Sequence, residues 1–142
     1  GVNASIEDMA KWLNAQLGHN PDVLSAQLLE KIQTPQVNTP GELRSSGWRN
    51  ERLTGAAYAM GWRVFDYKGH KLVFHGGAVR GYRSLIAFLP EQDTGLVVLW
   101  NSESAAPSAF LPAWFDLALG IQGGDWLGLS DPTGNSTATD PD

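Results

Sequence analysis

Residues 72–101, LVFHGGAVRGYRSLIAFLPEQDTGLVVLWN, decide the fold of this chain. They contain three strand-like apolar runs, Leu72–Phe74, Tyr82–Leu89 and Leu96–Trp100, which are separated by His-Gly-Gly and by a Pro-Glu-Gln-Asp-Thr-Gly turn. The connections are short, so we expect the strands to pair as an antiparallel meander. The last run is continuously apolar, which predicts a central strand covered on both faces. Two glycines follow His75, so another group can approach the backbone closely there, as at a strand edge that lines a ligand cleft.

Two helices are predicted before this region. Ser5 and Asp8 have the spacing of a capping box, and the apolar residues that follow recur at helical spacing, which predicts a helix over Ser5–Leu17. A second, shorter helix is predicted over Ser25–Gln33, because Thr34-Pro35 ends the helical pattern.

The segment between the helices and the sheet is predicted to be a long loop over residues 34–56, because it is rich in Pro and Gly and has few apolar side chains. Trp48 within it either anchors the loop to the surface or acts as a cleft or lid residue. Beyond the loop, Tyr58–Phe65 and Lys71–Phe74 are predicted to form a hairpin, in which Gly69 supplies the positive φ of the turn.

The C-terminal part predicts a last helix packed on the sheet. Ser104 is a candidate cap, and Pro107 suits a first turn, where a missing N–H costs nothing. Pro112 is expected to start the helix proper or to bend it, and Gly120 to end it. From Ser130 to Asp142 no apolar side chain is larger than Ala, so we expect disorder.

Composition narrows the classes of function. The net charge is −5 and the ten basic residues are scattered, which argues against a nucleic-acid partner. No apolar run approaches the roughly 20 residues that a membrane span requires. The sequence has no cysteine, and its three histidines lack the spacing of a zinc site, so we expect neither a metal nor a cofactor. Gly1-Val2-Asn3 lacks an initiator Met, so residue 1 is interpreted as an internal boundary.

The ordered set of motifs over residues 1–120 resembles the C-terminal portion of the serine β-lactamase and penicillin-binding-protein superfamily. The similarity is to class C β-lactamases, family VIII esterases, D-aminopeptidases and DD-carboxypeptidases. Val2–Leu17 is similar to the helix motif G-V-x-S-x-x-D-M-A-x-W-L of these proteins, and Gly61-Trp62 to the Gly-Trp before their hairpin. Residues 81–101 resemble G-F-x-S-x-x-A-F-x-P-E-x-x-x-G-V-V-x-L-x-N, and His-Gly-Gly stands where the superfamily has Lys-Thr-Gly or His-x-Gly.

The resemblance implies roles for His75, Gly76, Gly77 and Ala78, and two nearby arginines are further candidates. His75 would replace the basic residue of the motif and hold an anionic or carbonyl group of the substrate, and the N–H of Ala78 would donate to the oxyanion. Gly76 and Gly77 would leave room for substrate along the strand. Arg80 is a candidate for a substrate carboxylate, with a surface ion pair as the alternative, and the same alternatives apply to Arg83. Without the resemblance, a lone His at a strand end is more often structural than catalytic.

Two motifs of the superfamily are missing from this sequence. No Ser is followed three positions later by Lys, and no Tyr or Ser is followed two positions later by Asn in the way that a Tyr-x-Asn base requires. The chain by itself is therefore expected to be inactive, and its parent protein to supply the nucleophile. His75 and Gly76 in place of Lys and Thr weaken recognition of a β-lactam carboxylate, which favours an esterase or peptidase-like activity.

We therefore expect an α+β fragment, with an antiparallel sheet of about four strands, two N-terminal helices and a packed C-terminal helix. The expected divisions are the end of a helical subdomain with the long loop (1–56), the C-terminal part of an α/β subdomain (57–122), and a tail (123–142). The predicted parent is a serine hydrolase of esters, amides, peptides or β-lactams that forms an acyl-enzyme in a periplasmic or extracellular setting. The alternative is a non-catalytic module that docks, through an exposed sheet edge, onto the missing N-terminal part, a second chain or another copy as a homodimer.

Overall fold

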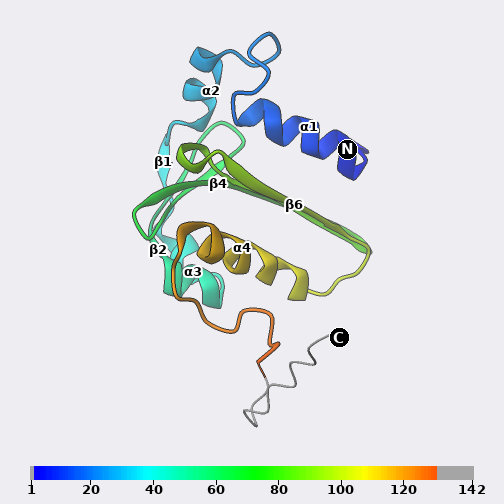
Figure 1. The fold of residues 1–142 in the computed structure, drawn as a ribbon, viewed down its shortest axis with the longest axis vertical. Coiled ribbons are helices and arrows are strands. Elements are labelled where there is room, and N and C mark those ends of the chain that lie inside the picture. Colours follow the sequence, from blue (N-terminus) through cyan, green and yellow to red (C-terminus); the bar gives the residue numbers. More distant parts are fainter. Residues whose placement is uncertain (1, 131–142) are drawn as a thin grey trace, which may run out of the picture.

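Six strands form one antiparallel sheet in residues 2–130, the part of the chain that a computed structural model describes. Each strand pairs with the next one along the chain, as the predicted meander requires (Figure 1). The sheet has more strands than the expected four. In order they are β1 Val37–Asn38, β2 Leu53–Tyr58, β3 Arg63–Tyr67, β4 His70–Val79, β5 Tyr82–Leu89 and β6 Thr94–Trp100. The predicted disorder of Ser130–Asp142 falls, apart from Ser130, outside the described residues.

The additional strands come from a segment whose prediction was wrong. Residues 34–56 are not one long loop: they hold β1, a 3₁₀ turn at Pro40–Arg44, the helix α3 (Gly47–Arg52) and most of β2. The predicted strand Tyr58–Phe65 is divided, because Gly61 adopts a φ of +80° and reverses the chain between β2 and β3. Gly69 has the expected positive φ, +89°, in the turn between β3 and β4.

The predicted helices are confirmed, with bounds that their capping residues explain. Helix α1 (Ile6–Gln16) begins after Ser5, whose hydroxyl accepts a hydrogen bond of 3.1 Å from the N–H of Asp8. Helix α2 (Ala26–Gln33) begins after Ser25 in the same way.

The C-terminal helix follows the sequence pattern except at its cap, because Ala109 and not the predicted Ser104 precedes it. Helix α4 (Phe110–Leu119) is preceded by a 3₁₀ turn that contains Pro107. Pro112 lies in its first turn, where the missing N–H has no intrahelical partner to lose. Gly120 ends the helix with a φ of +65°.

Helices cover both faces of the sheet, with α1 on one face and α3 and α4 on the other (Figure 1). On the first face, side chains of α1 pack on a cluster that includes Trp62, Val73, Ile86 and Phe88. On the second face lies a larger cluster, which comprises Trp48, Leu53, Phe65, Tyr67, Leu72, Phe74, Leu85, Ala87, Leu89, Leu111 and Phe115. Trp48 is buried in this cluster, so it anchors its segment to the core.

Strand β6 does not have the central position that its apolar sequence predicted. In the described part of the chain it pairs only with β5 and forms one edge of the sheet. Its residues are half-buried, and Leu99 is 39% exposed. The predicted cover on both faces is confirmed: α1 packs on one face, which carries Val97, and Leu96, Val98 and Trp100 pack on the cluster of the other face.

The buried carboxylate of Asp116 connects several elements on the second face of the sheet. Asp116 of α4 accepts hydrogen bonds from Arg52 Nε at 3.0 Å and from Arg52 Nη2 at 2.9 Å. The Tyr67 hydroxyl donates to it at 2.7 Å, and the Trp126 indole N–H donates at 2.7 Å. Arg52 and Asp116 are only 8% and 4% exposed. This network, which we call the Asp116 network, connects α3, β3, α4 and the segment that follows α4.

Replacing Asp116 by Ala is expected to lower the free energy of unfolding by about 3–5 kcal/mol, because the charge of Arg52 stays buried without its partner. Urea unfolding of the variant and the parent chain measures the difference. The matched control is Glu51→Gln, since Glu51 is exposed and lies 4.0 Å from Arg52. It is expected to change stability by less than about 0.5 kcal/mol. Equal losses in the two variants would contradict a special role for Asp116.

Stability is also expected to fall in acid through Asp116. Burial raises the pKa of this carboxyl, but the hydrogen bonds from Arg52, Tyr67 and Trp126 together outweigh burial, so the pKa lies below its ordinary value of 3.8. The folded chain thus binds this proton more weakly than the unfolded chain. The stabilisation is complete above the unfolded pKa and is lost as the pH falls through the folded one. Urea unfolding from about pH 5 downward should show this slope, and it should be smaller in Asp116→Asn.

Candidate functional site

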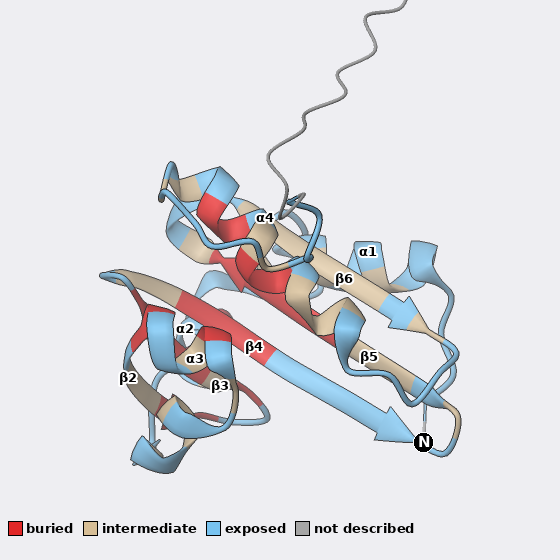
Figure 2. Ribbon diagram, turned by 90° about the horizontal axis from the view of Figure 1, so that it is seen from below, coloured by how far each residue is buried: buried red, intermediate tan, exposed pale blue. Residues whose placement is uncertain are grey.

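The second half of β4 is an exposed strand that only one neighbour pairs. Leu72, Val73 and Phe74 are buried, and every residue from His75 to Arg80 is exposed, as the change from red to blue along β4 in Figure 2 shows. Strand β5 pairs with β4 as far as Val79, whereas β3 pairs with it only as far as Phe74. Among the described residues, backbone groups beyond Phe74 that point away from β5 therefore have no strand partner.

The predicted site residues lie on opposite faces of this strand. His75 is opposite Ile86, which packs in the cluster beneath α1, so the imidazole is on the face that carries α1. Gly76 is opposite Leu85, which belongs to the cluster beneath α4, and Ala78 has the same orientation as Gly76. The strand thus presents a titratable side chain on one face and small residues on the other.

A cleft of about 560 Å³ lies on the face opposite His75. Gly76, Gly77 and Ala78 line it together with Leu85 and Ser84 of β5. Its walls are the segment around Trp48 on one side and the chain from the end of β6 to the first turn of α4 on the other. The volume falls in the range typical of small-molecule sites. Neither His75 nor Arg80 belongs to its lining.

Five charged side chains surround the cleft. Glu42 pairs with both Arg49 and Arg63. Arg83 donates to Glu103 at 2.6 Å, so the surface ion pair considered for Arg83 is present. Among the described residues Arg80 makes no ion pair, and the alternative considered for it is not found.

Burial and hydrogen bonds change the acidity of two of these groups. Burial lowers the pKa of Arg49, and the charge of Arg63 adds to this effect, while Glu42 opposes both. The pKa of Glu103 is lowered first by the N–H of Gly81, which donates at 2.7 Å, and second by Arg83. Glu103 is therefore a carboxylate that holds the β4–β5 turn and the Arg83 side chain in place.

Of the five charged residues of this cleft, the sequence pointed only to Arg83. Glu42 and Arg49 lie in the segment predicted to be a loop, and Arg63 lies in a strand whose start was misplaced. The alternation of β3 and β5 was the available signal, because it places Arg63 and Arg83 on the same face as Phe74. That signal required the register, which only the structure supplies.

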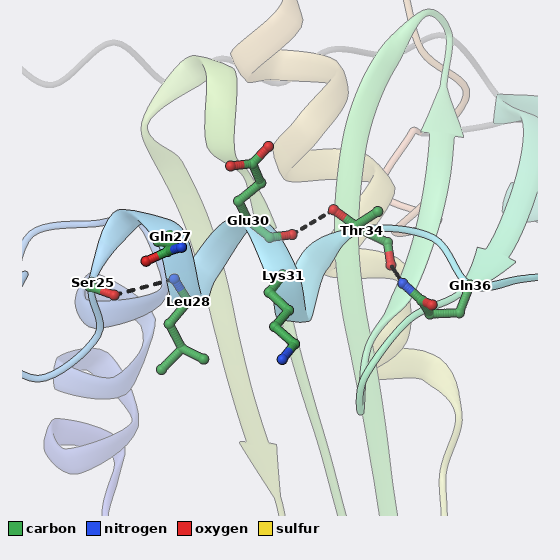
Figure 3. A pocket seen from close by; sticks show the side chains of 7 residues that line it. All are labelled: Ser25, Gln27, Leu28, Glu30, Lys31, Thr34 and Gln36. Carbon is green, nitrogen blue, oxygen red and sulfur yellow. Dashed lines mark hydrogen bonds between the residues drawn. The ribbon is translucent and has the colours of Figure 1, made fainter.

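A second hollow lies along α2 and carries no comparable chemistry (Figure 3). Its polar groups serve the local backbone: Ser25 caps the helix, and the Thr34 hydroxyl donates to the carbonyl of Glu30 at 2.6 Å. Lys31 and Leu28 extend to the other side of the helix from Glu30 in this view. Within residues 2–130, His, Asp and Glu do not gather in groups able to hold a metal ion. None of the helices there has the length and hydropathy of a membrane span.

Comparison with known proteins identifies the relatives of this fold. The family model described as Beta-lactamase matches residues 1–120. A structure of an octameric penicillin-binding protein homologue from Pyrococcus abyssi superposes with a TM-score of 0.70 at 30% identity, and the match covers 82% of this chain and 24% of that one.

Two curated relatives have sequence identities to this chain that are close to that of the Pyrococcus abyssi structure. Unguisins hydrolase ungD' of Aspergillus campestris is 31% identical over 99 residues, and Protein flp of Staphylococcus aureus is 33% identical over 100 residues. Each match covers 70% of this chain and 17% of the relative. The chain thus spans about a sixth of the length of these relatives.

Replacing Gly77 by Ala is expected to destabilise the exposed half of β4 by up to about 1 kcal/mol, because a Cβ at this position would overlap the Ser84 hydroxyl, which must rotate away. Adding Ser84→Ala should recover most of the loss, and urea unfolding of the single and double variants measures the coupling. Gly76→Ala is the matched control, since its Cβ would lie at an ordinary contact distance of 3.5 Å from the Phe74 ring. A Gly77→Ala variant as stable as the control would refute the collision.

Proposed function

Because the chain belongs to the Beta-lactamase family, in which it resembles serine hydrolases and penicillin-binding proteins, we propose that it is the C-terminal part of a serine hydrolase. The proposed reaction is cleavage of an ester, amide or β-lactam through an acyl-enzyme. The chain supplies one wall of the active site, the strand segment His75–Ala78. The nucleophile and its base come from the remainder of the parent protein, since Ser-x-x-Lys and Tyr-x-Asn do not occur in this sequence.

The observation that carries this proposal is the half-paired strand beyond Phe74. A substrate carbonyl needs hydrogen-bond donors that already point at the developing oxyanion, and an unpaired backbone N–H on a rigid strand is such a donor. Pairing with β5 fixes the strand, and the absence of β3 beyond Phe74 leaves its other side open within the described residues. The N–H of Ala78 is the donor that we propose.

His75 has a separate role in the proposal. Its imidazole lies on the α1 face and is exposed, so a nucleophile and a base presented by the rest of the protein can reach it from that side. An imidazole near neutrality can donate or accept a hydrogen bond, whereas a Lys is a fixed cation. We infer that His75 orients the proton-transfer network and the substrate carbonyl, and that this favours esters and amides over β-lactams.

A second candidate function is docking without catalysis, and β6 favours it, because among the described residues one edge of this strand has no partner. The strand carries no charged side chain and no Pro, which are the usual protections of an exposed edge. Phe110, Trp114 and Leu117 are exposed at helical spacing on α4, which packs beside β6. Such a surface would accept the remainder of the parent protein, a second chain or another copy. In the catalytic proposal the same surface joins the two parts of one enzyme.

Substitution of His75 by Ala in the full-length parent separates the two functions. The catalytic proposal expects kcat/KM for a chromogenic ester such as p-nitrophenyl acetate to fall by about 10²–10³-fold, because a group that orients proton transfer is lost. His70→Ala is the matched control, since His70 begins the same strand outside the exposed half and should leave kcat/KM within about twofold. Unchanged hydrolysis in His75→Ala would remove His75 from the active site. A parent without measurable hydrolysis would favour docking.

A further inference from the structure

We propose that Ser84 is a positioning residue for His75: its hydroxyl lies above Gly77, on the face of the sheet that carries the imidazole, and forms a hydrogen bond with that ring. This assigns Gly77 a role within the strand, which is to leave room for the hydroxyl. The hydrogen bond itself does not depend on the proposed hydrolase function, whereas its contribution to the reaction does.

The register of the sheet places the Ser84 side chain beside His75. Ser84 is opposite Gly77. His75, two residues earlier on β4, is opposite Ile86, so Ser84 and His75 are diagonal neighbours. Ile86 packs in the cluster beneath α1, and residues two apart on a strand share a face, so the Ser84 side chain lies on the α1 face as well. Diagonal neighbours are about 7–8 Å apart, a distance that an aromatic side chain spans. The imidazole can therefore reach the hydroxyl.

The space above Gly77 is filled by the Ser84 hydroxyl. A Cβ at position 77 would overlap Ser84 Oγ, so the hydroxyl takes the place that a side chain would have there. It stands one same-face position after His75 along β4, a step of about 7 Å. Within residues 2–130 neither the hydroxyl nor the imidazole is engaged by another group, so rotation of the imidazole is enough to join them.

The other same-face neighbours of His75 on β4 and β5 offer no hydrogen-bonding side chain. They are Val73, Gly77, Ile86 and Phe88. The next polar side chains on this face of the two strands are Lys71 and Tyr82. Each lies four positions from His75 along the strands, about 13 Å away. Ser84 is therefore the partner on these two strands that the imidazole can reach.

A serine hydroxyl suits an imidazole that takes part in proton transfer. It donates to an unprotonated ring nitrogen and accepts from a protonated one, so the bond persists when the ring gains or loses a proton. One ring nitrogen is then held by Ser84, and the other is left for the groups that the rest of the parent protein presents. A ring held in one rotamer has less freedom to lose when the substrate arrives.

The test of the bond is an NMR measurement on the 142-residue chain, labelled with ¹³C and ¹⁵N in histidine. Three-bond couplings across the Cα–Cβ bond of His75 are expected to report a single rotamer. Ser84→Ala is expected to give averaged couplings and to shift one ring-nitrogen signal. His70 begins the same strand and is the internal reference, with unchanged signals. Thr54→Ala is the matched control, because it removes an exposed hydroxyl from β2, which β3 separates from β4.

Two results would overturn the hydrogen bond. One is that the couplings and ring signals of His75 are the same in Ser84→Ala as in the unsubstituted chain. The other is an equal change in Thr54→Ala, which would show that the imidazole responds to any lost hydroxyl of the sheet.

The contribution to the reaction is tested in the full-length parent. Ser84→Ala is expected to lower kcat for p-nitrophenyl acetate by about tenfold and to leave KM within about twofold, because the hydroxyl acts through His75 and does not bind the substrate. An unchanged kcat would reject this contribution. Unchanged hydrolysis in His75→Ala would reject the catalytic role of His75 and leave the hydrogen bond standing. Loss of hydrolysis in His75→Ala together with a silent NMR comparison would reject only the role of Ser84.

Discussion

The buried carboxylate of Asp116 is the interaction on which the arrangement of the second face depends. A carboxylate removed from water must receive several hydrogen bonds, and here the donors come from three other segments: Arg52 at the end of α3, Tyr67 at the end of β3 and Trp126 beyond α4. Burial and the hydrogen bond to Asp116 both raise the pKa of Tyr67, so its hydroxyl stays protonated as a donor. By fixing α3 against α4, the Asp116 network sets the distance between the two walls of the cleft.

A second constraint is the unequal length of neighbouring strands. Strand β4 has 10 residues and β3 has five, so β3 leaves half of its neighbour unpaired on one side. The buried half, with Leu72, Val73 and Phe74, is held in both clusters of the core. The exposed half is held by its pairing with β5, and among the described residues its other edge has no strand partner. The backbone of such a strand has a fixed position and can still be reached by a ligand, and one wall of an active site requires both properties.

Much of the fold followed from the sequence where local patterns and tertiary packing agree. The capping box at Ser5, the positive φ of Gly69 and the stop at Gly120 are local signals, and the structure confirms all three.

The segment 34–56 was misread because its elements depend on distant partners: Trp48 is buried among aromatic rings of β3 and β4, and Arg52 forms its ion pair with Asp116, 64 residues away. The position of β6 was wrong for the same reason, since an apolar run does not reveal whether both of its neighbours are present. The candidate residues His75–Ala78 could be chosen from a motif, and Arg83 from its place beside Gly81-Tyr82. Arg49 and Arg63 could not be placed at the cleft before the register was known.

Successive side chains of β4 alternate between the two faces of the sheet. His75 points to one face of the sheet, and the arginines of the cleft gather on the other, so the backbone of a single strand stands between them. A substitution among these arginines therefore leaves the imidazole in place, and a substitution at His75 leaves the lining of the cleft in place. Within the described residues, the two faces of this strand can therefore be altered separately by substitution.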